Sequence, residues 1–288
     1  MEQIIDVSHQ CYPKELLKIK NKPLKLHVIG NEKLLNNKCI AIVGSRNCTA
    51  YGFKVAKQFA KELSQNDITI VSGLALGIDS AAHLGALEGI GSTIAVLGHG
   101  FKYIFPEENE ELYKKILNNN GCIITEYDFD VEPNSKNFPQ RNRIVSGISM
   151  GVLIVEAKSK SGSTITARLA KEQGKNVFCV PSNLDSIHGL GTNRLIQKGT
   201  KLVLGIDDIL EEYNIKNALV KDLIIEDKKI EIKEEYLPIY NLISNEPINI
   251  NELCKKSKMN ISKVNQILTM LEIEGVIEEK IGKEFIRK

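Results

Sequence analysis

The sequence predicts an α/β protein with a mostly parallel sheet covered by helices on both faces, followed by a small separate domain. From residue 38 onward, short apolar runs alternate with longer stretches of helical periodicity. This alternation is typical of right-handed βαβ units, which build parallel sheets. The run at residues 151–155 (Gly-Val-Leu-Ile-Val) has no polar side chain, as expected for a strand that is buried on both faces.

The alternating region spans residues 38–213. Strands are expected at residues 39–43, 68–71, 93–97, 122–125, 151–155, 176–180 and 201–203, and helices at 50–64, 78–88, 107–118, 140–148, 164–173 and 193–198. Residues 1–37 hold too few apolar residues for a core of their own, so we expect an N-terminal extension of turns and extended segments that packs on the core. In parallel sheets, ligands bind beyond the carboxyl ends of the strands, which makes the strand-to-helix turns the informative positions.

The C-terminal part of the chain has a different pattern. Residues 214–235 are rich in Lys, Glu and Asp and predict a charged linker. Residues 236–288 predict three helices followed by a β-hairpin, which is the winged-helix pattern; the third helix carries Val264, Ile267, Leu268 and Leu271 on one face. Its exposed side chains have mixed charge, so DNA and a protein are equally open as its partner.

Composition limits the classes of function. The formal net charge of the 288 residues is only +2, so any affinity for nucleic acid must come from a local patch. Six scattered cysteines form no C-x-x-C pair, which argues against zinc and disulfides and favours a reducing cytoplasm. The first residues lack the basic and apolar regions of a signal peptide, and no apolar run approaches the length of a membrane span.

One basic and aromatic stretch stands out before the most apolar strand. Lys136, Phe138, Arg141 and Arg143 place one flat ring among three cations. Single-stranded nucleic acid needs both chemistries, one for its bases and one for its phosphates. A capped helix with surface arginines would explain the same residues. If the stretch is helical, the side chains of Arg141 and Arg143 point about 200° apart, so only one can face a given pocket and the other ties the helix to the sheet.

The turn after the first predicted strand is a candidate anion site. It contains Gly44, Ser45 and Arg46, and backbone N–H groups at such a turn can bind an anion. The second glycine of a dinucleotide-binding G-x-G-x-x-G motif is missing, and no acidic residue ends the next strand, so NAD is poorly supported as a cofactor. Alternatively, Ser45 caps the following helix and Arg46 is merely solvated.

The turn after the buried strand offers a similar cradle. Ser161, Gly162, Ser163 and Thr164 supply hydroxyls and a glycine directly before a helix, without the Gly-Lys-Ser/Thr of an ATPase loop. Neither a G-x-S-x-G elbow nor a Cys/His pairing is present. Asp79 and His83 are four residues apart but lack a third metal ligand. We therefore expect neither a catalytic centre nor a metal or cofactor.

These motifs, in this order, closely resemble the DNA-processing protein A (DprA/Smf) family. The matching residues are Gly44-Ser45-Arg46 with Tyr51-Gly52, residues 72–79, 138–144, 155–157 and 161–167, and Val180-Pro181. The resemblance covers about residues 12–212, and the C-terminal part resembles the winged-helix domain of many members. It implies an extended Rossmann-like domain that binds single-stranded DNA without strong sequence preference and dimerises. It also implies transfer of the strand to the RecA recombinase during natural transformation, with no established catalytic reaction.

By motif position, the resemblance implies that Ser45 and Arg46 line the DNA pocket and that Phe138 stacks a base. The full set of expected DNA-binding residues is Gly44, Ser45, Arg46, Lys136, Phe138, Arg141, Arg143, Ser161, Gly162, Ser163 and Thr164. One alternative is a nucleotide phosphoribohydrolase of the lysine-decarboxylase-like group, although the Pro-Gly-Gly-x-Gly-Thr turn of that group is absent. Another is a winged-helix regulator whose larger domain senses a nucleotide.

Overall fold

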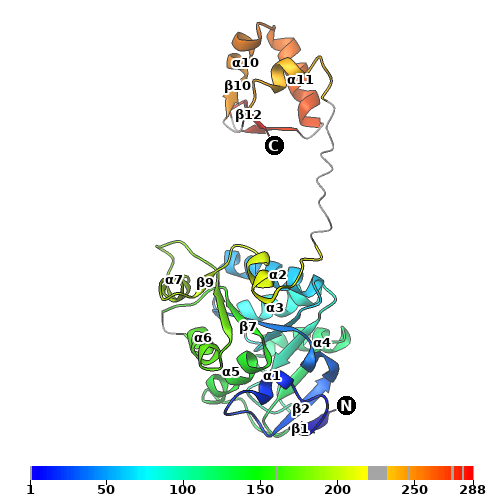
Figure 1. Cartoon of the computed structure of the whole chain (residues 1–288), viewed down its shortest axis with the longest axis vertical. Helices are drawn as coiled ribbons and strands as arrows, with labels where there is room; N and C mark the ends of the chain where they lie inside the picture. The colour runs from blue at the N-terminus through cyan, green and yellow to red at the C-terminus, as the bar shows by residue number, and fades with distance from the viewer. Residues whose placement is uncertain are drawn as a thin grey trace. The chain divides into compact units, whose positions relative to one another are not determined.

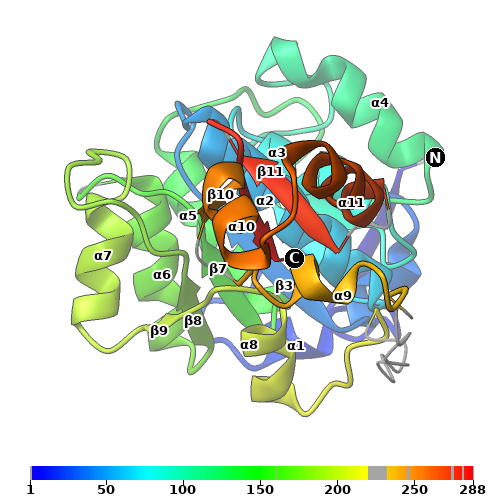
Figure 2. The same ribbon diagram turned by 90° about the horizontal axis from the view of Figure 1, so that it is seen from above.

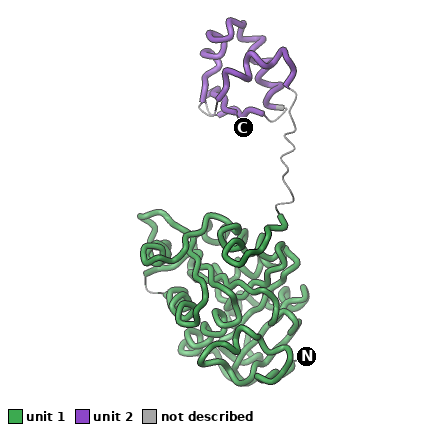
Figure 3. The backbone as a smooth tube through the Cα atoms, in the orientation of Figure 1, with its two compact units in different colours: residues 1–221 green, residues 222–288 purple. Residues whose placement is uncertain are grey.

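The chain divides into two compact units, residues 1–221 and 222–288 (Figure 3). The computed structural model describes residues 2–159, 161–219, 232–244, 247–273, 276–280 and 282–287. Residues 220–231, which make up most of the charged linker predicted at 214–235, therefore lie outside the described residues. None of the helices in the described part of the chain combines the length and the apolar character that crossing a membrane requires.

The first unit is built on one nine-stranded sheet with the order β1-β2-β6-β5-β4-β3-β7-β8-β9 (Figure 1). From β6 to β9 in this order all neighbouring strands are parallel, whereas β1 and β2 add to the β6 edge in antiparallel fashion. The mostly parallel sheet is thus confirmed, and the N-terminal extension contributes two strands to it. The strands are β1 (Gln3–Asp6), β2 (Lys25–Gly30), β3 (Cys39–Val43), β4 (Thr69–Ser72), β5 (Thr93–Val96), β6 (Cys122–Thr125), β7 (Gly151–Ile154), β8 (Asn176–Cys179) and β9 (Lys201–Leu202).

Helices cover both faces of this sheet, as the alternating pattern predicts. Side chains alternate along β3: Ala41 packs in the cluster with α1, α5 and α6, and Ile42 packs on the opposite face with α2, α3 and α8. Helix α4 covers Ala95 and Ile123 on that opposite face. Helices α5 and α6 lie side by side (Figures 1 and 2). The helices of this unit are α1 (Lys14–Leu17), α2 (Ala50–Gln65), α3 (Ile78–Ala86), α4 (Glu110–Asn118), α5 (Asn137–Ile148), α6 (Gly162–Glu172), α7 (Leu190–Gln197) and α8 (Asp207–Leu210), with 3₁₀ turns η1 (Glu32–Asn36), η2 (Glu107–Asn109) and η3 (Glu211–Tyr213).

The order of strands reverses at β3. The chain leaves β3 through α2 toward β4, and it later returns through α5 to β7 on the other side of β3. At such a switch point the two connections diverge to opposite faces, which opens a crevice beyond the carboxyl ends of the two strands. The turns after β3 and β7 are therefore the place where this fold can receive a ligand.

The second unit has the winged-helix pattern that the sequence predicts. It contains α9 (Leu237–Tyr240), α10 (Ile250–Ser257), α11 (Ile261–Ile273) and the hairpin of β11 (Ile277–Lys280) and β12 (Glu284–Arg287). A further two-residue strand, β10 (Ile248–Asn249), pairs with β12. Two residues are too few to show a periodicity, so the sequence did not indicate β10. Ile239, Leu253, Val264, Leu271 and Phe285 are among the buried residues of its core.

Candidate nucleic-acid interface

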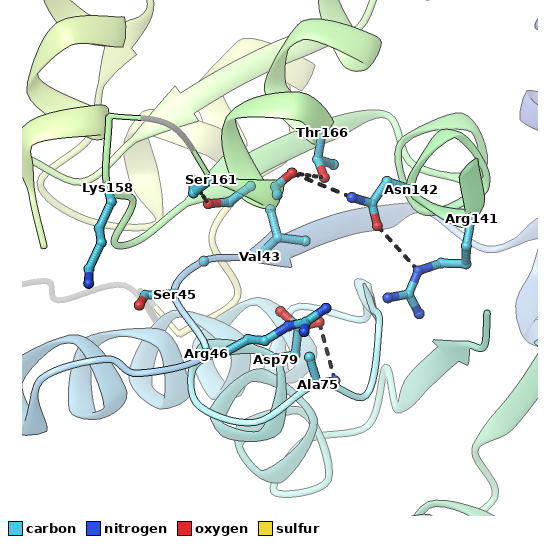
Figure 4. A pocket seen from close by; sticks show the side chains of 13 residues that line it. Val43, Ser45, Arg46, Ala75, Asp79, Arg141, Asn142, Lys158, Ser161 and Thr166 are labelled. Carbon is cyan, nitrogen blue, oxygen red and sulfur yellow. Dashed lines mark hydrogen bonds between the residues drawn. The ribbon is translucent and has the colours of Figure 1, made fainter. Parts of the chain in front are cut away.

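A cavity of about 390 Å³ opens between the turns that follow β3 and β7 (Figure 4). It lies at the switch point of the sheet, where the fold predicts a ligand site. Both predicted turns contribute to it, together with residues from the start of α3, from α5 and from α6. The lining residues are Val43, Gly44, Ser45, Arg46, Ala75, Asp79, Arg141, Asn142, Lys158, Ser161, Gly162, Ser163 and Thr166.

Close packing shapes the wall formed by the β3 turn. A Cβ atom at Gly44 would lie 2.6 Å from Cγ1 of Ile78, so only glycine lets this turn approach α3. Thr49 caps α2 by accepting a hydrogen bond from the Gly52 N–H, and it donates its own N–H and hydroxyl to Glu156 at 3.0 and 2.5 Å. Ser45 therefore does not cap this helix. The alternative explanation of that serine is wrong because Thr49 already fills the capping position.

Arg46 lies at the mouth of the cavity and is exposed. In Figure 4 its side chain extends along the lower wall, beside Asp79 and toward Arg141. The exposed guanidinium lines the same cavity as the hydroxyl-bearing turns that follow β3 and β7. An anion in the cavity could accept hydrogen bonds from it in the planar, bidentate geometry that guanidinium groups prefer.

The opposite wall is the start of α6. Ser161 caps this helix in a capping box with Thr164, whose hydroxyl donates to the Ser161 carbonyl at 2.7 Å. Ser161, Gly162 and Ser163 line the cavity, as predicted, whereas Thr164 is turned back to the cap. The first turn of α6 thus directs backbone N–H groups and the positive end of its dipole to the cavity.

Lys158, Asn142 and Thr166 also line the cavity but were not among the predicted site residues. Lys158 is exposed, and in Figure 4 its amino group lies across the cavity mouth near Ser45. Its position in the turn between the buried strand β7 and α6 was the signal that could have identified it, because the carboxyl ends of parallel strands meet at one edge. The prediction instead named residues 161–164 of the same turn, because they are rich in hydroxyls and glycine.

Arg141 joins α5 to the sheet. Its side chain is 4% exposed, and Nη1 donates to the carbonyl of Gly73 at 2.8 Å and to that of Val96. Burial lowers the pKa of Arg141 to about 10, which still leaves it charged at neutral pH. Burial raises the pKa of the neighbouring Asp79, although the Arg141 charge opposes that rise. Arg141 is therefore a buried structural cation that also reaches the cavity wall.

Arg143 points away from the cavity, as the helical geometry of α5 requires. Its Nη1 and Nη2 each lie 2.6 Å from a carboxylate oxygen of Glu126, and Nε donates to the Asn21 carbonyl at 2.8 Å. The structure thus does not bring Arg143 to the predicted pocket, and its contact with DNA stays a prediction. Lys136 is exposed just before α5 and also lies outside the cavity lining.

Phe138 belongs to a second, smaller cavity of about 110 Å³. Its ring is half-buried, and the guanidinium carbons of Arg46 and Arg141 lie 5.4 and 6.0 Å from the ring centroid. Helix α5 begins at Asn137, three residues earlier than expected, because a proline is tolerated in the first turn of a helix. The smaller cavity is lined by Arg46, Gly73, Ala75, Leu76, Phe105, Pro106, Phe138 and Arg141.

Asp79, which lines the larger cavity, and His83, on the same helix, are both held by contacts within the fold. Asp79 accepts hydrogen bonds from the N–H groups of Gly73 and Ala75 at 3.0 and 3.4 Å. His83 is fully buried against the Thr93 hydroxyl, and burial lowers its pKa to about 3. Within the described part of the chain, His, Cys, Asp and Glu side chains form no group of three or more that could hold a metal ion.

Comparison with known proteins identifies the family. The model of DNA recombination-mediator protein A matches residues 3–214, and the model of the DprA winged helix domain matches residues 229–283. The chain belongs to the DNA recombination-mediator protein A (DprA) family. Similar members are DprA of Streptococcus pneumoniae, 42% identical over 205 residues (70% of this chain and 71% of that protein), and DprA of Bacillus subtilis, 41% identical over 215 residues (74% and 72%). The match to protein Smf of Escherichia coli, 41% identical over 208 residues, covers 72% of this chain but only 56% of that protein.

Solved DprA structures have the same fold. The X-ray structure of S. pneumoniae DprA aligns with a TM-score of 0.70 and 39% identity, over 73% of this chain and 74% of that one. DprA of Helicobacter pylori, whose single-stranded DNA binding mode has been described structurally, aligns with a TM-score of 0.67 and 33% identity, over 74% and 96%. The resemblance to the DprA family and its Rossmann-like fold is thereby confirmed.

Proposed function

We propose that this chain is a recombination mediator that binds single-stranded DNA without catalysing a reaction. The observation that carries the proposal is the meeting of two cavities at Arg46: one is lined by cations and N–H donors, the other by aromatic rings. A single strand presents phosphates and bare base faces side by side, whereas a duplex hides its base faces in the stack.

Each part of the strand has a complementary surface. Arg46, Lys158 and the first turn of α6 surround the space that a phosphate would occupy. Phe138 supplies the flat surface for the attached base. Contacts to phosphate and to a base face carry little sequence information, so weak sequence preference is expected. The DNA-binding residues that we propose are those that line the two cavities.

Three carboxylates favour a binding protein over an enzyme: Asp79, which lines the larger cavity, and Glu126 and Glu156, which follow β6 and β7. Glu126 is held by Arg143, and Glu156 accepts hydrogen bonds from Thr49. Asp79 is buried and bonded to backbone N–H groups. A general acid or base must be able to reach a substrate, and these three groups are already committed to the fold. Their contacts therefore speak against the phosphoribohydrolase alternative.

We further propose a cytoplasmic homodimer that transfers DNA to RecA. All six cysteines are free thiols, in keeping with a reducing compartment. Strand β9 ends the sheet order, and Leu202 and Leu204 at this edge are 39% and 81% exposed. Exposed apolar side chains at a sheet edge are candidates for burial against a second copy.

The proposal is tested with fluorescently labelled oligo-dT and a duplex of the same length. Wild-type protein is expected to bind the single strand more tightly and to co-precipitate RecA when the strand is present. Equal or tighter binding of the duplex would contradict the proposed site. Binding of the single strand without recruitment of RecA would contradict the mediator role and leave the DNA site intact.

Lys158 should contribute to binding through charge. Replacing a phosphate-contacting cation reduces the number of counterions that binding releases, so the slope of log K against log salt is expected to fall by about 0.7 in Lys158→Ala. Lys115→Ala removes the same charge from α4, outside both cavities, and serves as the control. An unchanged slope in Lys158→Ala would place the phosphate elsewhere.

A further inference from the structure

The smaller cavity contains an aromatic residue that the sequence motifs did not single out. Phe105 lies in the loop between β5 and η2 and is 43% exposed, although it is a large apolar side chain. Its ring stacks on that of Phe138 with centroids 5.6 Å apart and an interplanar angle of 24°. The rings of His99 and Phe105 are nearly perpendicular, at 88°, with centroids 6.5 Å apart.

The surrounding loops support this pair of rings. Gly100 and Lys102 donate backbone hydrogen bonds to the carbonyls of Val131 and Phe129, at 2.8 and 2.9 Å. A Cβ atom at Gly98 would lie 2.8 Å from Cδ1 of Phe138, so this glycine gives the second ring its place. Rings that are already oriented lose little freedom when a ligand stacks on them.

We propose that Phe105 is a second base-stacking residue and that the smaller cavity receives one unpaired nucleobase. This inference rests on the proposed binding of single-stranded DNA. Phe105 and Phe138 form one side of the cavity, Leu76 and Pro106 add apolar surface, and Arg46 lies at its border with the larger cavity. The phosphate attached to the base therefore reaches the cations of the larger cavity.

The spacing of the rings decides how the base sits. Bases stack about 3.4 Å apart in DNA, so insertion between two rings needs a separation of about twice that distance. The two centroids are only 5.6 Å apart. The base thus stacks against the outer surface of the ring pair and does not enter between the two rings.

The first test compares Phe105→Leu with Phe129→Leu, which removes a ring of similar exposure (52%) from outside both cavities. The fluorescence anisotropy of a short labelled oligo-dT is measured at fixed salt. Phe105→Leu is expected to bind about tenfold more weakly, the usual loss for one stacked base. Phe129→Leu and the ring-retaining Phe105→Tyr should bind like the wild type.

A double-mutant cycle shows whether the lost contact is made with a base. A single abasic site is moved along the oligonucleotide, and each version is titrated with wild type and with Phe105→Leu. At one position the abasic site should cost the wild type about tenfold and the variant less than twofold. Equal penalties for both proteins at every position, or wild-type affinity of Phe105→Leu, would overturn the role of Phe105. The proposed function would survive that result if Arg46→Ala still weakened binding by about 30-fold or more. It would fail together with this inference if the wild type did not bind the strand.

Discussion

Arg46→Ala is expected to weaken the binding of oligo-dT by about 30- to 100-fold. Arg46 borders both cavities, so its loss removes charge-assisted hydrogen bonds to a phosphate, worth about 1.5–3 kcal/mol, and a cation near the Phe138 ring. Together these two losses amount to about 2–3 kcal/mol of binding free energy, which corresponds to the expected 30- to 100-fold change in affinity. The affinity is measured by fluorescence anisotropy at fixed ionic strength, since phosphate contacts depend strongly on salt.

The control for Arg46→Ala is Arg168→Ala. Arg168 is exposed on α6, pairs with Glu172 at 2.8 Å and lies outside both cavities, so its replacement removes the same charge elsewhere. The affinity of Arg168→Ala for oligo-dT should stay within about twofold of wild type, because Arg168 lines neither cavity, and the fold should tolerate the change because exposed ion pairs contribute little to stability. The Tm of Arg46→Ala should stay close to that of wild type, because the Arg46 charge disfavours the charge of Arg141 but favours that of Asp79. Equal losses in both variants would mean that net charge, and not this site, binds the DNA.

Much of the site follows from sequence because topology brings distant turns together. Residues 44–46 and 161–163 are more than a hundred positions apart, yet both follow strands whose carboxyl ends meet at one sheet edge. The position of Arg46 and of the α6 turn could thus be predicted without coordinates. The same reasoning explains why the fold class was predictable: alternation of short and long apolar patterns leaves few topologies open.

Other features depend on contacts that no local pattern encodes. Helical geometry shows that Arg141 and Arg143 diverge, but which of them faces the cavity is set by carbonyls at residues 73 and 96 and by the position of Glu126. Phe105 is an isolated aromatic in the sequence, and only the fold stacks it on Phe138. Residues 1–37 were expected to pack on the core, and the structure also makes them part of the sheet through the pairing of β2 with β6. Backbone pairing of this kind is not visible in amino-acid composition.

The second large effect concerns stability. Arg141→Met is expected to lower the free energy of unfolding of the first unit by about 3–5 kcal/mol, the usual cost of removing one partner of a buried charge. Methionine fills most of the volume, but the carbonyls of Gly73 and Val96 lose their donor and the buried Asp79 loses its neighbouring cation. Urea unfolding followed by far-UV circular dichroism measures the change, with Arg143→Met as the control. Arg143 is 20% exposed in its pair with Glu126, so the control should lose less.

The pH dependence of the stability of Arg141→Met distinguishes the loss of the Arg141 charge from the loss of its hydrogen bonds to two carbonyls. Burial already raises the pKa of Asp79 above its ordinary value, and Arg141 is the largest influence that opposes the rise. Loss of that cation raises the pKa of Asp79 in the folded state further above its value in the unfolded state. The contribution of Asp79 to the free energy of unfolding therefore falls as the pH rises through its folded pKa. The stability gap between Arg141→Met and wild type should therefore narrow as the pH is lowered from 8 to 5. Asp79→Asn in the Arg141→Met background should recover part of the loss at pH 8. A gap that is independent of pH, and unchanged by Asp79→Asn, would mean that the two carbonyl contacts alone account for the stabilising role of Arg141.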